Sequence, residues 1–185
     1  MNMNEILCNT QFLQLKSTPS KSGKPWVYAH RPNATDVVVI LPTTPEEVMF
    51  LIEERPPLQA ENKGKYAIGV AAGLVGDERI GESIEDAIKA ELLEETGLIA
   101  DKIEIKARKV ASSAGCVSET CTLAIAHIKD KNTISRPVSD DGVIVDRVWV
   151  KKEDIKTWLR QKESEGCVLT AQSLSALFYL EKENI

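Results

Sequence analysis

The chain has 185 residues, of which 43% are hydrophobic and 28% are charged, which is typical of a soluble globular protein of one domain with at most a short extra arm. Its net charge of -5 argues against non-specific binding to nucleic acid or to an anionic membrane. The longest aliphatic run, residues 37–41, is too short to span a bilayer, so we expect no membrane segment.

The N-terminal residues and the cysteines bear on location. The sequence MNMNEILCNTQ lacks the basic start and apolar stretch of a signal peptide. The four cysteines form no C-x-x-C pair, and with two histidines they give no zinc-binding pattern. We therefore expect a cytoplasmic protein with reduced thiols.

The first half of the chain begins with β patterns. Strands are predicted at residues 12–17 and 25–31, around a turn that contains Pro19 and Gly23. Three further strands are predicted, at residues 36–41, 48–54 and 65–74, and a helix follows at residues 83–96.

The second half alternates strands and helices. Strands are predicted at residues 103–111, 121–128 and 142–150, and helices at residues 151–162 and 170–182. Thr170 is the expected N-cap of the last helix. The predicted boundary lies near residues 32–34, so we expect a β arm at residues 1–33 and a second domain at residues 34–185.

The helix at residues 83–96 has clear end signals. Ser83 can cap its start, with Asp86 at the capping-box position, and Gly97 can supply a left-handed stop. Ile84, Ile88 and Leu92 form an i, i+4, i+8 stripe that should face the core.

The same helix carries a cluster of acids. Glu91 and Glu95 fall beside the apolar stripe, and Glu94 lies one side chain further round. A solvated helix face is the usual explanation of a charge run, but here two of the three acids occupy positions where burial is expected. Buried carboxylates without a counter-charge are costly, and Mg²⁺ prefers carboxylate oxygens as ligands. The cluster therefore predicts a divalent cation site, and the cation would attract a diphosphate to an acidic protein.

The spacing of these acids resembles a known motif. Gly76, Glu82 and the segment AELLEETGL match the box of the Nudix hydrolase family, G-x5-E-x7-R-E-U-x-E-E-x-G-U, in which U is a bulky aliphatic residue. Ala90 stands where the family has arginine. As an alternative for the first glycine, AAGL resembles the family's PAGL, so that Gly73 would be the counterpart and the following loop would be three residues longer.

The resemblance extends to the ADP-ribose pyrophosphatase branch of the family. The segments that carry it are GKPWVYAHR, ERPPL with KYAIGVAAGL, SSAGCVSET and EGCVLTAQSLSALFYL. The implied fold is an α/β/α sandwich with a mixed sheet, preceded by a small N-terminal β arm that commonly helps to form a homodimer. The implied partners are a small nucleoside diphosphate substrate and a second copy of the chain, with no nucleic acid and no membrane.

The chemistry that the resemblance implies is hydrolysis of a diphosphate linked to another moiety, ADP-ribose or a nucleotide sugar, with Mg²⁺ or Mn²⁺. The matching catalytic and metal-binding positions are Glu91, Glu94 and Glu95, with Glu82 in support and Ala72 among the metal-binding positions.

The remaining candidates lie outside the box, and each has a structural alternative. Glu119 is the candidate general base, or a solvated loop acid. Arg55 is expected to bind a phosphate, or to be a surface residue that only contributes to solubility. Trp26 and Arg31 are expected to contact the ligand from a neighbouring subunit, with Trp26 stacking on the base, or to pack within the arm.

Departures from the family pattern keep a second function open. In the family the box arginine braces the glutamates, and Ala90 removes that brace, which leaves the cluster dependent on the cation, on water or on a basic group from elsewhere. Ala71 and Ala114 also replace family prolines. We expect an active but slow enzyme, and the alternative is a Nudix domain that binds a nucleotide ligand as a sensor or scaffold.

Overall fold

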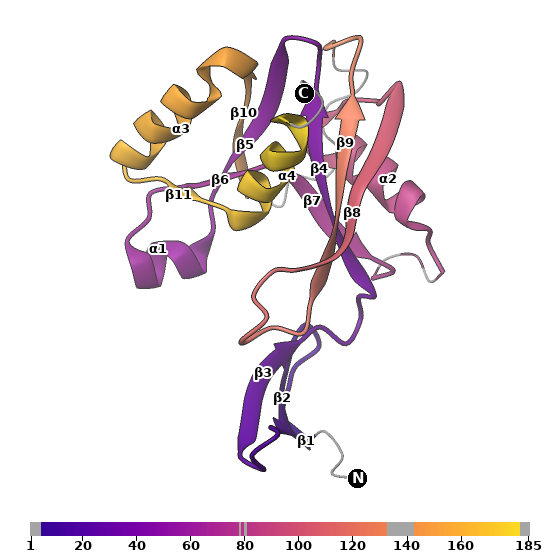
Figure 1. Cartoon of the computed structure of the whole chain (residues 1–185), viewed down its shortest axis with the longest axis vertical. Helices are drawn as coiled ribbons and strands as arrows, with labels where there is room; N and C mark the ends of the chain where they lie inside the picture. Colours follow the sequence, from indigo (N-terminus) through magenta and orange to yellow (C-terminus); the bar gives the residue numbers. More distant parts are fainter. Residues whose placement is uncertain (1–4, 78, 80, 133–142, 182–185) are drawn as a thin grey trace.

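A computed structural model describes residues 5–77, 79, 81–132 and 143–181 of the chain, which form two separate β-sheets and four α-helices (Figure 1). The first strands are β1 (Glu5–Asn9), β2 (Gln14–Pro19), β3 (Pro25–His30), β4 (Asp36–Thr43) and β5 (Glu47–Glu53). The middle of the chain forms α1 (Pro56–Asn62), β6 (Ala67–Gly69), β7 (Ala71–Val75), α2 (Ile84–Thr96), β8 (Lys102–Ala111) and β9 (Thr120–His127). The last elements are β10 (Ile144–Lys151), the 3-10 helix η1 (Lys152–Asp154), α3 (Ile155–Ser164), β11 (Val168–Leu169) and α4 (Ala171–Glu181).

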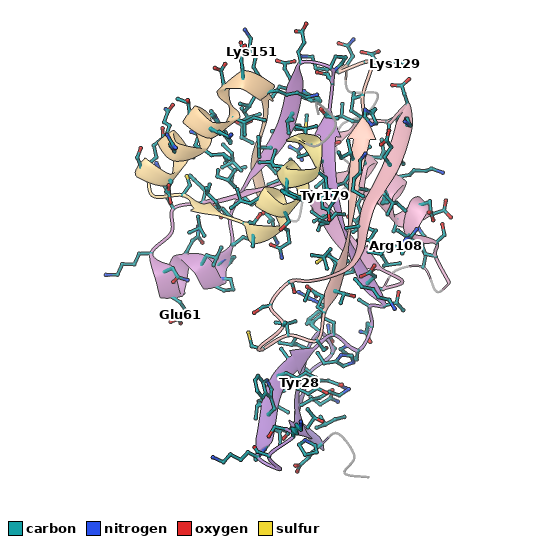
Figure 2. The ribbon with its side chains drawn as sticks, in the orientation of Figure 1. Tyr28, Glu61, Arg108, Lys129, Lys151 and Tyr179 are labelled. Carbon is teal, nitrogen blue, oxygen red and sulfur yellow. The ribbon has the colours of Figure 1, made fainter. Side chains whose placement is uncertain are left out.

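The smaller sheet is an antiparallel arm made of β1, β2 and β3. It projects from one end of the molecule, where Tyr28 marks it in Figure 2. The arm touches its own chain through the loop between β8 and β9. Ala29 N–H donates to Cys116 O at 2.8 Å, and Ser118 N–H donates to Ala29 O at 3.0 Å. The predicted boundary near residues 32–34 falls between β3 and β4.

The larger sheet has eight strands in the order β11-β6-β5-β4-β9-β8, with β10 also paired to β5 and β7 to β4. The sheet is mixed, because β4 runs parallel to β9 while β5 and β7 run antiparallel to β4. Strand β4 is therefore central, and all its residues from Val38 to Thr43 are buried.

Helices cover both faces of this sheet, which gives the three layers of a sandwich. Successive side chains of β4 point to opposite faces. Val38 and Ile40 pack in one cluster with Ile88 and Leu92 of α2, whereas Val39 and Leu41 pack in the other cluster with residues of α3 and α4. The fold class predicted from the sequence is therefore confirmed. None of the helices in the described ranges is both long and apolar enough to cross a membrane.

Several elements differ from the predictions. Strand β1 and helix α1 were not predicted, and the predicted strand at residues 65–74 is two strands, because β6 pairs with β5 while β7 pairs with β4. The predicted helix at residues 151–162 begins with the 3-10 turn η1, and α3 follows it. Positions 142 and 182 of the predicted elements lie outside the described residues.

Candidate functional site

Helix α2 begins and ends where the sequence indicated. Ser83 Oγ accepts from the Asp86 N–H at 3.1 Å, and Gly97 ends the helix at φ 73° with its N–H donating to Leu93 O. Asp86 reaches the Ser83 hydroxyl, with Ser83 Oγ to Asp86 Oδ2 at 2.7 Å. Arg147 of β10 donates to the backbone carbonyl of Glu95 and so places a cation at the negative end of the helix. These contacts fix the axis of the helix that carries the acids.

Glu95 is a half-buried acid on the sheet side of α2. Its Oε2 accepts a hydrogen bond from the Ala72 N–H of β7 at 2.9 Å. Burial raises the pKa of this carboxyl from its ordinary value of 4.5 to about 8, an effect that the Ala72 hydrogen bond opposes and that nearby Glu91 and Glu53 increase. The negative charge on Glu95 is therefore destabilised by the protein alone, and a bound cation would compensate it.

Glu91 lies against a glycine that leaves it room. A Cβ atom built at Gly73 would lie 1.9 Å from the carboxyl carbon of Glu91, far inside contact distance. Gly76 is required for its backbone conformation and not for space. Its φ is +85°, and the atom nearest to a Cβ built there would be Thr35 Oγ1, at an ordinary contact distance of 3.7 Å. The close approach of Glu91 supports Gly73 as the counterpart of the first glycine of the box.

Glu82 and Glu94 share one basic partner, Arg79, in the loop before α2. Arg79 Nη1 donates to Glu82 Oε1 at 3.2 Å, and Arg79 Nη2 lies 3.6 Å from Glu94 Oε1. The Glu82 side chain is 8% exposed and that of Arg79 is 57% exposed, so the pair joins a buried acid to a solvated guanidinium.

The acids of α2 have the type of side chain that binds a hard divalent cation. Among the described residues, no three His, Cys, Asp or Glu side chains already converge closely enough to hold a metal ion. Glu91 stands three residues before Glu94 and four before Glu95, and residues at these spacings on a helix have Cβ atoms about 5–6 Å apart, so Glu91 can share an ion with either of them. Carboxylates are the ligands that Mg²⁺ prefers, and the residues present therefore fit a divalent cation.

Arg55 lies beside this cluster, at the edge of a cavity of about 310 Å³. The cavity is also lined by Ala72, whose N–H binds Glu95, and by Thr170 and Ser173 near the start of α4. Arg55 Nε donates to Glu53 Oε2 at 3.0 Å, and the Arg55 side chain stays 44% exposed. Glu53 therefore holds the guanidinium in place while part of it faces the cavity and solvent.

Trp26, Arg31 and Glu119 form a second group, where the arm meets the loop between β8 and β9. Trp26 Nε1 donates to Gly115 O at 2.8 Å while the residue stays 52% exposed. Arg31 Nε donates to Glu119 Oε2 at 2.7 Å. The cavity around Arg31 and Glu119, about 110 Å³, is lined by residues 30–31, 34–37 and 118–120, without the acids of α2. The structure thus pairs the candidate base Glu119 with Arg31, while Trp26 contacts the same loop separately, at Gly115.

Two residues of the site were missed by sequence reasoning. Arg79 stands three positions before Glu82, a spacing at which opposite charges can meet, and this signal could have found it. Glu53 is a charged residue that is only 2% exposed at the end of the apolar strand β5. A carboxylate within an apolar run, two residues before Arg55, was the available signal.

Comparison with known proteins identifies the family. A model of the Nudix domain matches residues 31–168, three quarters of the chain, and the chain belongs to this family. This membership places it in the class of Nudix-type pyrophosphohydrolases, whose members generally use divalent metal ions.

A solved structure shows the same fold. It is described as an ADP compounds hydrolase and resembles this chain with a TM-score of 0.70 and 18% sequence identity, over 97% of this chain and 90% of that chain. Among curated proteins, no sequence matches the chain significantly. The predicted sandwich with its N-terminal β arm is thus confirmed at the level of the fold.

Proposed function

We propose that the protein hydrolyses the diphosphate of a nucleoside diphosphate linked to another moiety, with Mg²⁺ or Mn²⁺ bound by Glu91, Glu94 and Glu95 and supported by Glu82 and the Ala72 position. The observation that carries the proposal is the placement of Glu95, which is held against Ala72 N–H with its pKa raised to about 8. A buried carboxyl whose ionisation is unfavourable without a metal is typical of a functional site, and a bound cation would stabilise its charged form. The fold neighbour described as an ADP compounds hydrolase favours ADP-ribose or a nucleotide sugar as substrate.

The residues around the acids have distinct roles in this proposal. The bound metal would supply Lewis-acid polarisation of the phosphoryl oxygens and a water of lowered pKa. Arg55, oriented by its 3.0 Å contact with Glu53, would bind a phosphate oxygen with the exposed part of its guanidinium. Glu119 remains the candidate base, and because Arg31 contacts its Oε2, its Oε1 is the oxygen that would accept a proton from water.

The substrate is identified by a panel of diphosphate compounds. ADP-ribose, nucleotide sugars and dinucleotides would be incubated with Mg²⁺, and release of a mononucleotide would be measured. We expect turnover of ADP-ribose or a nucleotide sugar above the rest of the panel. Turnover of nucleoside triphosphates alone would contradict this substrate class.

Ligand binding with little or no turnover is the second candidate function. Ala90, in the place of the box arginine, is the observation that favours it. The two functions separate when binding and product release are measured on one sample, because a sensor would bind the compound without releasing a mononucleotide.

A cytoplasmic location is also part of the proposal. The thiols of Cys8, Cys116, Cys121 and Cys167 are all free, as a reducing compartment would keep them.

The substitution Trp26→Ala tests a ligand-binding role for the arm. We propose that Trp26 stacks on the base of the substrate and that Arg31 lies near the same ligand. Stacking on the base should stabilise the bound substrate and the transition state about equally. We therefore expect KM for adenine-containing substrates to rise about tenfold, with kcat changed much less.

The matched control is Trp26→Phe, which keeps an aromatic face but loses the hydrogen bond to Gly115. KM of this variant should stay near the wild-type value if stacking matters. Equal damage by both substitutions would instead show that Trp26 serves to hold the loop at Gly115.

We further propose that the arm sheet forms a homodimer interface. The arm exposes the apolar side chains of Ile6 and Leu7 in β1, Leu15 in β2 and Val27 in β3, and those of Phe12, which is 71% exposed, and Leu13 in the turn between β1 and β2. An exposed apolar patch rimmed by polar residues is typical of an interaction surface. We expect light scattering after size-exclusion chromatography to give a dimer mass for the wild type and a monomer mass for Phe12→Asp. A monomeric wild type would contradict the proposal.

A further inference from the structure

We infer that Arg79, in the loop before α2, braces the acid cluster by bridging Glu82 and Glu94 across the space that Ala90 leaves open. The inference deepens the proposed function and rests on it, because it assigns a positioning residue to the same cation site. Arg79 thereby takes the part of the basic group that the box lacks at position 90.

The geometry is that of a guanidinium fork joining two acids. The two terminal nitrogens of Arg79 address different carboxylates, with Nη1 at 3.2 Å from Glu82 Oε1 and Nη2 at 3.6 Å from Glu94 Oε1. A planar guanidinium is suited to such double contacts, whereas the ammonium of a lysine is a point charge. One side chain therefore fixes the positions of two acids that stand twelve residues apart in the sequence.

The small side chain at position 90 provides the room. Ala90 and Arg79 both line an open depression of about 610 Å³, together with Glu82 and Glu94. The same four residues line an adjoining cavity of about 30 Å³, which is large enough for a single water molecule. An arginine at position 90 would extend into the space beside Glu94, so the two basic groups are alternative occupants of one region.

The acids around the smaller cavity favour a positively charged side chain beside them. Asp77, Glu82, Glu91 and Glu94 contribute carboxylates to the lining of the smaller cavity, and Arg79 is the one basic residue in that lining, within the described part of the chain. Lys89 lines the larger depression, but its Nζ lies 3.9 Å from Asp86 Oδ1 on the outer side of the helix. The guanidinium of Arg79 thus offsets part of the repulsion between the acids, through its contacts with Glu82 and Glu94.

The length of the loop explains how Arg79 reaches this position. If Gly73, beside Glu91, is the counterpart of the first glycine of the box, the segment from Gly73 to Glu82 is three residues longer than the motif requires. Arg79 lies within this longer segment.

Arg79 contacts Glu94, one of the three proposed metal ligands, and could therefore affect metal binding in either of two ways. Arg79 contacts Glu82 and Glu94, whereas Glu95 contacts Ala72 and Glu91 lies against Gly73. A brace would fix Glu94 for the metal, and its loss would weaken metal binding. A guanidinium that merely occupied the metal position would have the opposite effect, because its loss would tighten metal binding.

Titration with Mn²⁺ in the absence of substrate, followed by the electron paramagnetic resonance of free Mn²⁺, distinguishes these two roles. We expect Arg79→Ala to weaken Mn²⁺ binding about tenfold, as is typical when a group that orients a metal ligand is lost. The conservative variant Arg79→Lys should recover part of this loss. In the Arg79→Ala background, Ala90→Arg should restore binding and turnover, whereas Ala90→Arg alone should bring no gain.

Lys89→Ala is the matched control, since it removes another basic side chain from the same depression, and it should bind Mn²⁺ like the wild type. Unchanged or tighter Mn²⁺ binding by Arg79→Ala, with binding by the wild type intact, would overturn the role of Arg79 alone. Absence of Mn²⁺ binding by the wild type would overturn the proposed function together with this inference. Thermal unfolding of each variant shows whether it is folded.

Discussion

Replacing Glu95 with glutamine is expected to abolish hydrolysis while the protein stays folded. Glutamine has nearly the same shape, and its amide oxygen can still accept the hydrogen bond from Ala72 N–H that Glu95 accepts at 2.9 Å. The substitution removes the negative charge that would bind the cation. Metal-assisted charge stabilisation is worth several kcal/mol, so we expect turnover to fall by about 10²- to 10⁴-fold. Initial rates at saturating Mg²⁺ and substrate measure the effect.

The same variant should be more stable than the wild type when no metal is present and the pH is high. The folded-state pKa of Glu95 is about 8, above the ordinary value of 4.5. The favourable contribution of this carboxyl is therefore fully present below about pH 4.5 and is lost as the pH rises through about 8. Because glutamine does not titrate, the variant's gain in Tm over the wild type should grow between about pH 5 and about pH 9.

The difference should amount to several kcal/mol at about pH 9, because each unit of pKa difference corresponds to about 1.4 kcal/mol. About 1 kcal/mol shifts Tm by about 2–4 °C in chains of this length, so the gain in Tm should be on the order of 10 °C. Glu85→Gln is the matched control, because Glu85 is an exposed acid of the same helix, 3.4 Å from the Arg108 that Figure 2 labels. It should keep wild-type activity.

Full turnover by Glu95→Gln would show that Glu95 is not a metal ligand.

The substitutions Gly73→Ala and Gly76→Ala should have opposite consequences. At Gly73 an added Cβ would lie 1.9 Å from the carboxyl carbon of Glu91, so this carboxylate must move. It is the end of a flexible side chain, and its displacement should cost little stability but remove a metal ligand. We expect activity to fall about 10²-fold or more, for the same reason as the loss of Glu95.

At Gly76 the space for a Cβ is adequate, but the backbone has φ +85°, which side-chain-bearing residues adopt at a cost of about 1–2 kcal/mol. Gly76→Ala should therefore lower Tm by about 2–8 °C and keep its activity. Parallel measurement of Tm and kcat for both variants checks the pair. Loss of activity at Gly76 with retention at Gly73 would identify Gly76 as the glycine that the site requires.

The elements with strong local signals were predicted correctly. Helix α2 combines an N-cap at Ser83, an apolar stripe through Ile88 and Leu92, and a stop at Gly97, and each of these acts within a few residues. The family of the chain followed from the same segment, because four glutamates at fixed spacing carry the motif.

The incorrect predictions concern elements whose structure depends on residues far away in the sequence. Residues 65–74 show one continuous apolar pattern, but the chain changes neighbour after Gly69, so that β6 pairs with β5 and β7 pairs with β4. Sheet pairing depends on residues far away in the sequence, and a local pattern does not contain it. Helix α1 was missed because its seven residues include two prolines at the start and no buried side chain.

The site was predicted in its acids but not in its basic group. The absence of arginine at position 90 was visible in the sequence, whereas the approach of Arg79 to Glu82 and Glu94 depends on the course of the loop. Likewise, the pairing of Arg31 with Glu119 joins residues 88 positions apart. Contacts of this kind follow from the tertiary fold and not from spacing.

The most direct test of the proposed metal-dependent hydrolysis is ³¹P nuclear magnetic resonance of the best diphosphate substrate with the wild-type protein. The spectrum distinguishes the two phosphates of the intact diphosphate from the phosphomonoesters that cleavage would release. We expect the diphosphate signals to be replaced by two phosphomonoester signals when Mg²⁺ is present, and to persist when the metal is chelated. Persistence of the intact diphosphate at every Mg²⁺ concentration, in a sample that binds the compound, would contradict hydrolysis and establish a binding protein instead.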